Sequence, residues 1–155
     1  MSAVLFVCLG NICRSPAGEG VLIHLLQERN IDHIKVGSCG TASYHIGEAA
    51  DKRMRAAASK RGIDLPSRAE QFQIAHFDEY DYILTADQSV HEDILSLARH
   101  EDDAARVYLM THFSTDYQGQ EVPDPYYGGQ DGFDHVLDML EESCTGLLDH
   151  ISSSS

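Results

Sequence analysis

The sequence predicts an α/β fold in which helices cover both faces of a parallel sheet. Short apolar runs alternate along the 155 residues with segments whose apolar residues recur at helical spacing. The first run, AVLFV at residues 3–7, is apolar throughout, as in a strand buried on both faces. No change of composition marks a boundary, so we expect one domain over residues 1–151, followed by a disordered serine tail at 152–155.

The first half of the chain contains two predicted strands and two predicted helices. After the strand at 3–7, helical spacing relates the apolar residues Ala17, Val21, Leu22, Leu25 and Leu26. A brief strand near residues 34–36 precedes a loop of small and polar residues that runs to about Gly47. A helix over residues 49–61 should end at Gly62, which tolerates the left-handed backbone common after helices.

The second half repeats the strand and helix pattern. YDYILTA at 80–86 is the clearest later strand, and Asp87 is placed to cap a helix with apolar residues Val90, Ile94, Leu97 and Ala98. RVYLM at 106–110 is a fourth strand, followed by a loop to about residue 130. The apolar face of a final helix comprises Phe133, Val136, Leu137, Leu140, Cys144, Leu147, Leu148 and Ile151.

Charge and cysteine usage exclude several classes of protein. A net charge of −14 disfavours nucleic acid and anionic membranes as partners. No apolar run is long enough to span a bilayer and the N-terminus lacks signal-peptide features, so a cytoplasmic location is expected. The four cysteines have neither zinc spacing nor a disulfide pattern, and we interpret them as thiols, with no metal and no cofactor expected.

The segment LFVCLGNICRSP at residues 5–16 predicts an anion-binding loop. Ligands of open parallel sheets lie beyond the carboxyl ends of strands, where this turn falls. Gly10 can adopt positive φ and Asn11 tolerates it, so successive amides can curl around an anion at a helix N-terminus. Arg14 adds a planar charged group that matches two phosphate oxygens, and the loop therefore suits a tetrahedral oxyanion.

Cys8 ends the first strand at the base of this loop, where the same donors would stabilise a thiolate. A thiolate beneath a bound phosphate indicates dephosphorylation through a nucleophilic cysteine. Neither a G-x4-G-K-S/T nor a G-x-G-x-x-G motif is present, so the loop is not a nucleotide-binding one. Taken singly, Cys8 and Cys13 could be buried hydrophobes and Arg14 a surface charge.

Two further residues carry alternative interpretations. Ser15 could cap the helix ahead of Pro16, or its hydroxyl could donate to the Cys8 sulfur. Asp124 lies between two prolines in VPDPYYGG, which suits an acid that protonates a leaving oxygen, with Tyr126 and Tyr127 beside a flat substrate ring. Asp124 could equally belong to a polar turn, with the tyrosines covering the core.

These motifs closely resemble the low-molecular-weight protein-tyrosine phosphatases. The resemblance rests on VCLGNICRSP and DPYYG and covers nearly the whole chain, including Ser38, RGI at 61–63 and FDEYDYIL before Asp87. It implies a flavodoxin-like, four-stranded parallel sheet in the order 2-1-3-4, with helices on both faces and the phosphate loop after strand 1. It also implies hydrolysis of phosphotyrosine and other aryl phosphates without a metal.

The resemblance implies a role for each matched residue. Cys8 attacks phosphorus and forms a cysteinyl-phosphate, and Asp124 first protonates the leaving phenolate and then activates water. Ser15 and Asn11 hold the thiolate and the loop. The phosphate oxygens are bound by the Arg14 side chain and by the backbone amides of Leu9, Gly10, Asn11, Ile12, Cys13 and Arg14. The walls of the pocket are Leu9, Ile12, Tyr44, Tyr126 and Tyr127, with Tyr44 where many members have Trp.

The resemblance also bears on regulation and substrate. Cys13 matches a second loop cysteine that can form a disulfide with Cys8 under oxidants, while Cys39 and Cys144 are expected to be inert. Related protein-arginine phosphatases have Thr at the position of Ile12, so Ile12 favours a tyrosine-type substrate. The implied partner is a phosphotyrosine-containing protein, with tyrosine kinases as one candidate.

Two other functions fit parts of the pattern. A thiol-dependent arsenate reductase would need further cysteines, and none lies between Cys39 and Cys144. A module that binds phosphoproteins without cleaving them should have lost the nucleophile, the arginine or the acid, and Cys8, Arg14 and Asp124 are all present.

The acidic surface bears on the choice of substrate. It should slow encounter with acidic phosphopeptides more than with basic ones.

Overall fold

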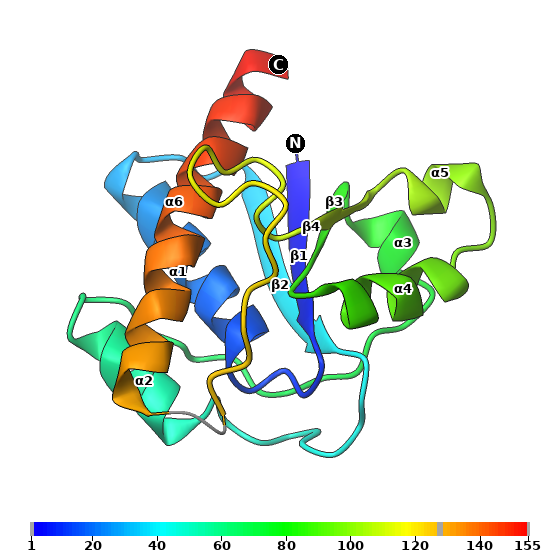
Figure 1. The fold of residues 1–155 in the computed structure, drawn as a ribbon. Helices are drawn as coiled ribbons and strands as arrows, with labels where there is room; N and C mark the ends of the chain where they lie inside the picture. Colours follow the sequence, from blue (N-terminus) through cyan, green and yellow to red (C-terminus); the bar gives the residue numbers. More distant parts are fainter. Residues whose placement is uncertain (1, 127–128, 155) are drawn as a thin grey trace.

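The computed structural model describes residues 2–126 and 129–154. Strands and helices alternate as predicted (Figure 1). The strands are β1 (Ser2–Cys8), β2 (Ile34–Gly40), β3 (Tyr82–Thr85) and β4 (Val107–Leu109). The helices are α1 (Arg14–Glu28), α2 (Lys52–Ser59), α3 (His76–Glu79), α4 (Gln88–Ser96), α5 (Glu101–Ala104) and α6 (Gln130–Ser154).

The four strands form one parallel sheet in the order β2-β1-β3-β4, which confirms the predicted topology. β2 is longer than the predicted strand at 34–36, because it pairs with β1 along its whole length, from Ser2 opposite Ile34 to Cys8 opposite Gly40. Its small residue Gly37 is required by packing, since a Cβ there would lie 2.5 Å from the hydroxyl oxygen of Tyr80.

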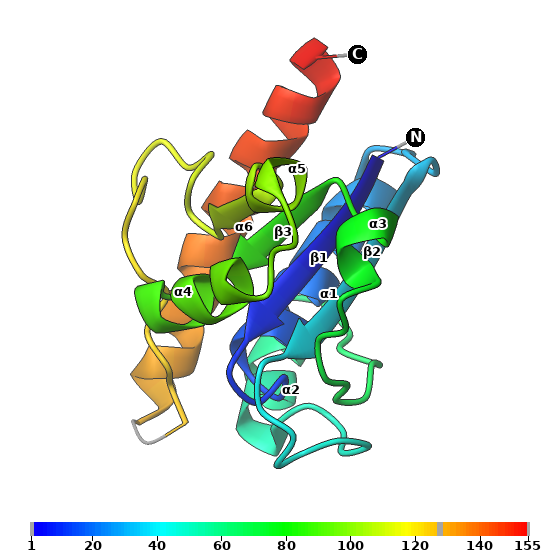
Figure 2. The same cartoon turned by 90° about the vertical axis from the view of Figure 1, so that its right-hand side faces the viewer.

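Helices cover both faces of the sheet, and β1 supplies side chains to both. Val4 and Phe6 point into the larger core with α1, α2 and α6, whereas Leu5 and Val7 point into the smaller core with α3 and α4. Figure 1 shows the two helical layers on either side of the strands, and Figure 2 shows the sheet between them. This alternation explains why the strand at 3–7 is apolar at every position.

Two predicted helix ends are confirmed, at Asp87 and Gly62. Asp87 accepts a hydrogen bond from a backbone amide in the first turn of α4. α2 is shorter than the helix predicted over residues 49–61, because Asp51 caps it and it ends at Ser59. Gly62, after α2, has φ +77°, the left-handed conformation expected there. The four-residue helices α3 and α5 were not predicted, because one turn is too short to show a period.

Most predicted core residues are buried, Leu25 and Ala98 are half-buried, and one is exposed. Every apolar residue predicted for the face of α6 is buried. Leu97, predicted on the apolar face of the helix after Asp87, is instead 43% exposed, because α4 ends at Ser96 and the chain turns away. α6 continues to Ser154, so residues 152–154 are helical in the structure, where the sequence predicts a disordered tail.

The carboxyl ends of the strands gather at one edge of the sheet, at the lower end of the molecule in Figure 1. Both chain termini lie at the opposite, upper end. The loops that follow β1, β2 and β3 therefore meet at one place, as the rule for ligand sites in parallel sheets requires. Among the described residues, no helix has the length and apolar character needed to cross a bilayer.

Candidate active site

The predicted anion-binding loop connects β1 to α1, with one correction to its backbone. Asn11 has φ +57°, whereas Gly10 lies outside the left-handed region. Gly10 is needed for a different reason: a Cβ at this position would lie 3.0 Å from Cδ2 of His45, which packs over the loop. The loop is also close to β2, since a Cβ on Gly40 would come within 2.7 Å of the Leu9 carbonyl oxygen.

Cys8 lies at the last position of β1, at the base of this loop. The residue is only 3% exposed, and it lines the surface pocket described below. The backbone amide of Asn11 donates to Sγ at 3.3 Å, and the hydroxyl of Ser15 lies 3.0 Å from Sγ. The sulfur thus accepts from one backbone amide and faces one hydroxyl, which also donates to the carbonyl of Cys39 at 3.2 Å.

Ser15 and Asn11 form a buried polar network behind the sulfur. Ser15 is the second residue of α1 and caps nothing, since the capping position is Cys13 and no side chain bonds there. The capping interpretation of Ser15 is therefore wrong, and its hydroxyl instead contacts Cys8. Asn11 Nδ2 donates to Ser15 Oγ at 2.7 Å, while Asn11 Oδ1 accepts from the amide of Glu70 at 2.9 Å. The network holds the hydroxyl against the sulfur.

Arg14 begins α1 and is almost completely buried, with 3% of its surface exposed. Its Nη1 donates to Asp87 Oδ2 at 2.6 Å and to the carbonyl of Val122 at 3.0 Å. Burial alone would lower the pKa of Arg14, but Cys8 and Asp87 together raise it above its ordinary value. The guanidinium is therefore held charged and fixed in orientation beside the sulfur.

Asp87 is one of two site residues that the sequence patterns did not reveal, because they indicate only a capping role for it. The structure gives its carboxylate two tasks: Oδ1 accepts from the amide of Val90 at 2.9 Å, and Oδ2 binds Arg14. Its position directly after β3, at the carboxyl edge of the sheet, was the available signal.

Asp124 extends from the loop between β4 and α6 toward the same place. Its Oδ2 lies 3.8 Å from Arg14 Nη2, and its side chain is 38% exposed. Its Oδ1 accepts a hydrogen bond from the amide of Tyr126 at 3.0 Å. The carboxylate therefore also takes part in a polar turn, which was the alternative interpretation of Asp124. One oxygen stabilises the turn and the other faces the arginine.

Most of the residues predicted for the site line one pocket of about 110 Å³. It is lined by Cys8, Leu9, Gly10, Ile12, Cys13, Arg14, Tyr44, His45, Asp124 and Tyr126. His45 was not predicted, and its ring is held by a 2.8 Å contact between Nδ1 and Glu48. Tyr126 packs under the guanidinium of Arg53, which lies 5.2 Å from the ring centroid. The predicted wall residue Tyr127 lies outside the described residues.

The four cysteines are free and buried. Burial, with the charge of Asp51, raises the pKa of Cys13 above its ordinary value. Burial likewise raises the pKa of Cys39 and of Cys144, which lie away from the pocket lining. Within residues 2–126 and 129–154, no three His, Cys, Asp or Glu side chains gather to hold a metal ion.

A thiol beneath a loop of amides, with a buried arginine six residues after it and a carboxyl group opposite, is the arrangement of the cysteine-dependent phosphatases with a C-x5-R loop. The family model for low molecular weight phosphotyrosine protein phosphatases matches residues 3–155. The chain belongs to this family.

Individual proteins agree with the family. The chain is 40% identical over 148 residues to a low molecular weight protein-tyrosine-phosphatase of Streptomyces coelicolor, with 94% of this chain and 90% of the relative covered. The crystal structure of a protein tyrosine phosphatase from Entamoeba histolytica superposes with a TM-score of 0.95, at 37% identity and 99% coverage of both chains. An arginine phosphatase of Drosophila has a TM-score of 0.92 at 28% identity, covering 100% of each chain.

Proposed function

We propose that this chain hydrolyses phosphotyrosine in proteins, and other aryl phosphate monoesters, with Cys8 as the nucleophile. The observation that carries the proposal is the position of the Cys8 sulfur at the base of a pocket that Arg14 and Asp124 also line. Every reacting group required for transfer of a phosphoryl group to a thiolate is therefore within one small site.

The first step transfers the phosphoryl group to sulfur. The Cys8 thiolate attacks phosphorus, the S–P bond forms, and the bond from phosphorus to the phenolic oxygen breaks. Arg14 and the amides of residues 9–14 bind the three remaining oxygens, whose charge is spread in the transition state. Asp124, protonated at this stage, gives its proton to the leaving phenolate.

The second step regenerates the enzyme. Asp124, now a carboxylate, takes a proton from a water molecule, which attacks phosphorus as the S–P bond breaks. Inorganic phosphate leaves and the thiolate returns, stabilised by the Ser15 hydroxyl and the Asn11 amide. Asp124 ends protonated, ready for the next cycle.

Tyrosine is the preferred phosphorylated residue in this proposal. Ile12 places a branched apolar side chain in the pocket lining together with Leu9, Tyr44 and Tyr126, and such walls suit a flat aromatic ring. The structural similarity to an arginine phosphatase makes phosphoarginine the necessary comparison. The substrate is a phosphotyrosine-containing protein, and a tyrosine kinase that carries its own phosphotyrosine is one candidate.

We further propose that Cys13 protects Cys8 from irreversible oxidation. Peroxide converts the Cys8 thiolate to a sulfenic acid, and the Cys13 thiol then displaces water to form a disulfide. Because burial raises the pKa of Cys13, disulfide formation should become faster as pH increases. A Cys13→Ser protein should lose activity to peroxide permanently, whereas the wild-type activity should return with a thiol reductant.

The decisive experiment is turnover of peptides that contain phosphotyrosine, phosphoserine or phosphoarginine by the purified protein. Phosphotyrosine should be the preferred substrate. Cys8→Ser should abolish turnover while inorganic phosphate still binds. Turnover by the Cys8→Ser protein would contradict the mechanism, and phosphopeptide binding without turnover by the wild type would favour the binding-module alternative.

A further inference from the structure

A second groove begins at the rim of the active-site pocket. Its volume is about 450 Å³, and Leu9 and Tyr44 line both the groove and the pocket. From these two residues the groove runs past Phe72 to Leu97 and Asp93, at the end of α4. We call it the flanking groove, because it shares Leu9 and Tyr44 with the pocket and extends away from it.

Three large apolar side chains of the flanking groove are exposed, next to the polar residues Thr41, Gln71, Asp93 and Ser96 of its lining. Leu9 and Leu97 are each 43% exposed and Tyr44 is 76% exposed, whereas Phe72 is buried beneath them. Exposed apolar side chains that line one continuous depression are typical of a binding surface. Leu97 has the residue type of a core position in α4 and nevertheless lies on this surface.

The floor of the flanking groove is joined to the phosphate loop. The amide of Thr41 donates to the carbonyl of Cys8 at 3.0 Å, and the amide of Ala42 donates to the carbonyl of Leu9 at 2.9 Å. Gln71 Nε2 donates to the carbonyl of Thr41 at 3.2 Å. A ligand in the groove therefore meets a surface already ordered relative to the reacting sulfur, which lowers the cost of binding.

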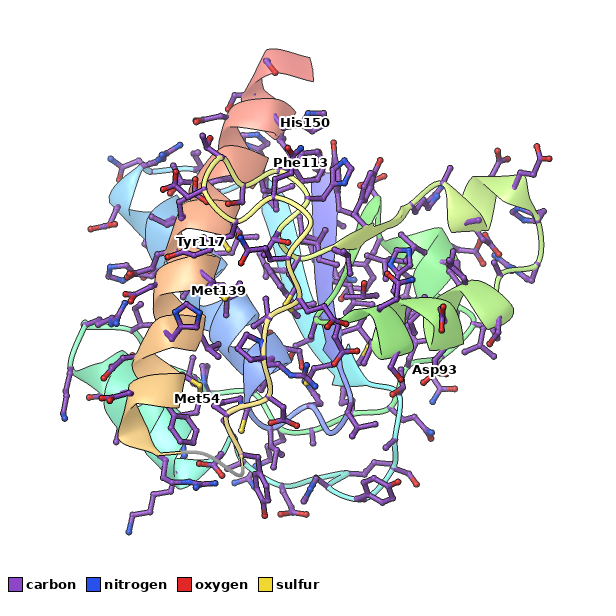
Figure 3. The ribbon with its side chains drawn as sticks, in the orientation of Figure 1. Met54, Asp93, Phe113, Tyr117, Met139 and His150 are labelled. Atoms are coloured by element: carbon purple, nitrogen blue, oxygen red, sulfur yellow. The ribbon has the colours of Figure 1, made fainter. Side chains whose placement is uncertain are left out.

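The charge at the far end of the groove is negative. Within the part of the chain that the structure describes, no Lys or Arg lines the groove, and no hydrogen bond or ion pair engages the carboxylate of Asp93. Figure 3 shows Asp93 on α4, next to the loop that follows β2. An exposed carboxylate beside an apolar surface favours a ligand with an apolar portion followed by a cation.

We propose that the flanking groove binds the substrate polypeptide beside its phosphotyrosine. An apolar side chain of the substrate packs against Leu9 and Leu97, and a Lys or Arg further along pairs with Asp93. The preferred substrates are then phosphotyrosine segments that carry an apolar and a basic residue on one side. This inference rests on the proposed function and names the substrate class of the same site.

The test compares peptides and matched variants at constant ionic strength. One peptide carries Leu and Lys beside the phosphotyrosine, a second carries Ser and Asp, and each is made with the pair before or after the phosphotyrosine.

Each variant has a matched control. Asp93→Asn is paired with Glu92→Gln, the same charge change one residue away and outside the groove. Leu97→Ser is paired with Leu95→Ser, an exposed leucine of α4 that does not line the groove. A small aryl phosphate, para-nitrophenyl phosphate, reports the reaction without the groove.

Asp93→Asn should lower kcat/KM for the Leu-Lys peptide by about two- to fivefold, as expected for an exposed ion pair. Leu97→Ser should lower it by about tenfold, because part of an apolar contact is lost. Glu92→Gln and Leu95→Ser should leave it unchanged, and all four variants should hydrolyse the aryl phosphate like the wild type.

Three outcomes would contradict the inference and are distinguishable from each other. If the wild type turns over both peptides equally, the groove does not select the residues beside the phosphotyrosine. If Glu92→Gln matches Asp93→Asn, the acidic surface acts as a whole and Asp93 has no specific role. If neither the peptides nor the aryl phosphate are hydrolysed, the proposed function itself fails, and this inference fails with it.

Discussion

The carboxylate of Asp87 lies 2.6 Å from the guanidinium of Arg14, although 73 residues separate them in the chain. The other oxygen of the same carboxylate accepts a hydrogen bond from the amide of Val90 in the first turn of α4. One side chain thus fixes Arg14 relative to the strand β3 and the helix that follows it. The orientation of Arg14 depends on the packing of the whole sheet edge.

Replacing Asp87 by Asn should reduce catalysis through Arg14. The variant removes the charge that orients the buried guanidinium, and a misplaced catalytic group lowers kcat by about tenfold to a hundredfold. Steady-state kinetics with an aryl phosphate measures the loss. Glu121→Gln is the matched control, because Glu121 accepts from the amide of Gln88 at the same helix end. Equal activity of the two variants would remove Asp87 from its positioning role.

Asp124→Asn should affect esters according to their leaving group. An Asn cannot donate a proton to the leaving oxygen, so kcat/KM for a phenyl phosphate should fall by about a hundredfold. An activated ester such as para-nitrophenyl phosphate has a leaving oxygen that needs less protonation, so its kcat/KM should fall only a few fold. The comparison is made on kcat/KM because this quantity reports the first chemical step. Equal losses on both esters would show that Asp124 is not the acid.

Gly10 and His45 should show coupled effects on phosphate binding. In Gly10→Ala the new methyl group meets the ring of His45 at 3.0 Å, and Glu48 restrains that ring from moving away. Overpacking of this kind costs about 1–3 kcal/mol, so inhibition by inorganic phosphate should weaken by about fivefold or more. Adding His45→Ala should restore binding in the double variant. Persistent weakness there would mean that Gly10 serves the backbone and not the packing.

His91 should make the stability of the fold depend on pH below neutrality. Burial lowers the pKa of His91 below its ordinary value of 6.5, and its Nδ1 lies 2.9 Å from the hydroxyl of Thr85. The unfolded chain then binds this proton more readily than the folded one. The stabilisation of the fold by neutral His91 is therefore fully present above pH 6.5. It is lost as the pH falls through the lowered pKa that His91 has in the folded protein.

Urea unfolding at about pH 7.5 and about pH 5.5 measures this effect. The wild type should lose more free energy of unfolding between the two conditions than His91→Asn, which cannot be protonated there. His33→Asn, at an exposed position, is the control and should behave like the wild type. If His91→Asn shows the same loss as the wild type, other groups are responsible.

Much of the fold followed from patterns that are local in the sequence. A strand buried on both faces must be apolar at every position, as in AVLFV, and a helix that covers it must repeat its apolar residues at helical spacing. The phosphate loop was equally readable, because Cys8, Asn11 and Arg14 lie within one short segment. The extent of β2 was not readable, because pairing with β1 carries its small and polar residues into the sheet.

The sequence by itself determined the alternation of strands and helices, the thiol of Cys8 in a loop after the first strand, and the place of Asp124 between two prolines. The strand order was implied by the resemblance to a known family. Only the tertiary structure decided that Asp87 orients Arg14, that His45 packs over Gly10, and that Leu97 and Asp93 form a groove beside the pocket. These contacts arise where parallel strands end side by side. No local periodicity specifies which side chains meet at that edge, because the distance between side chains of different loops depends on how the helices pack.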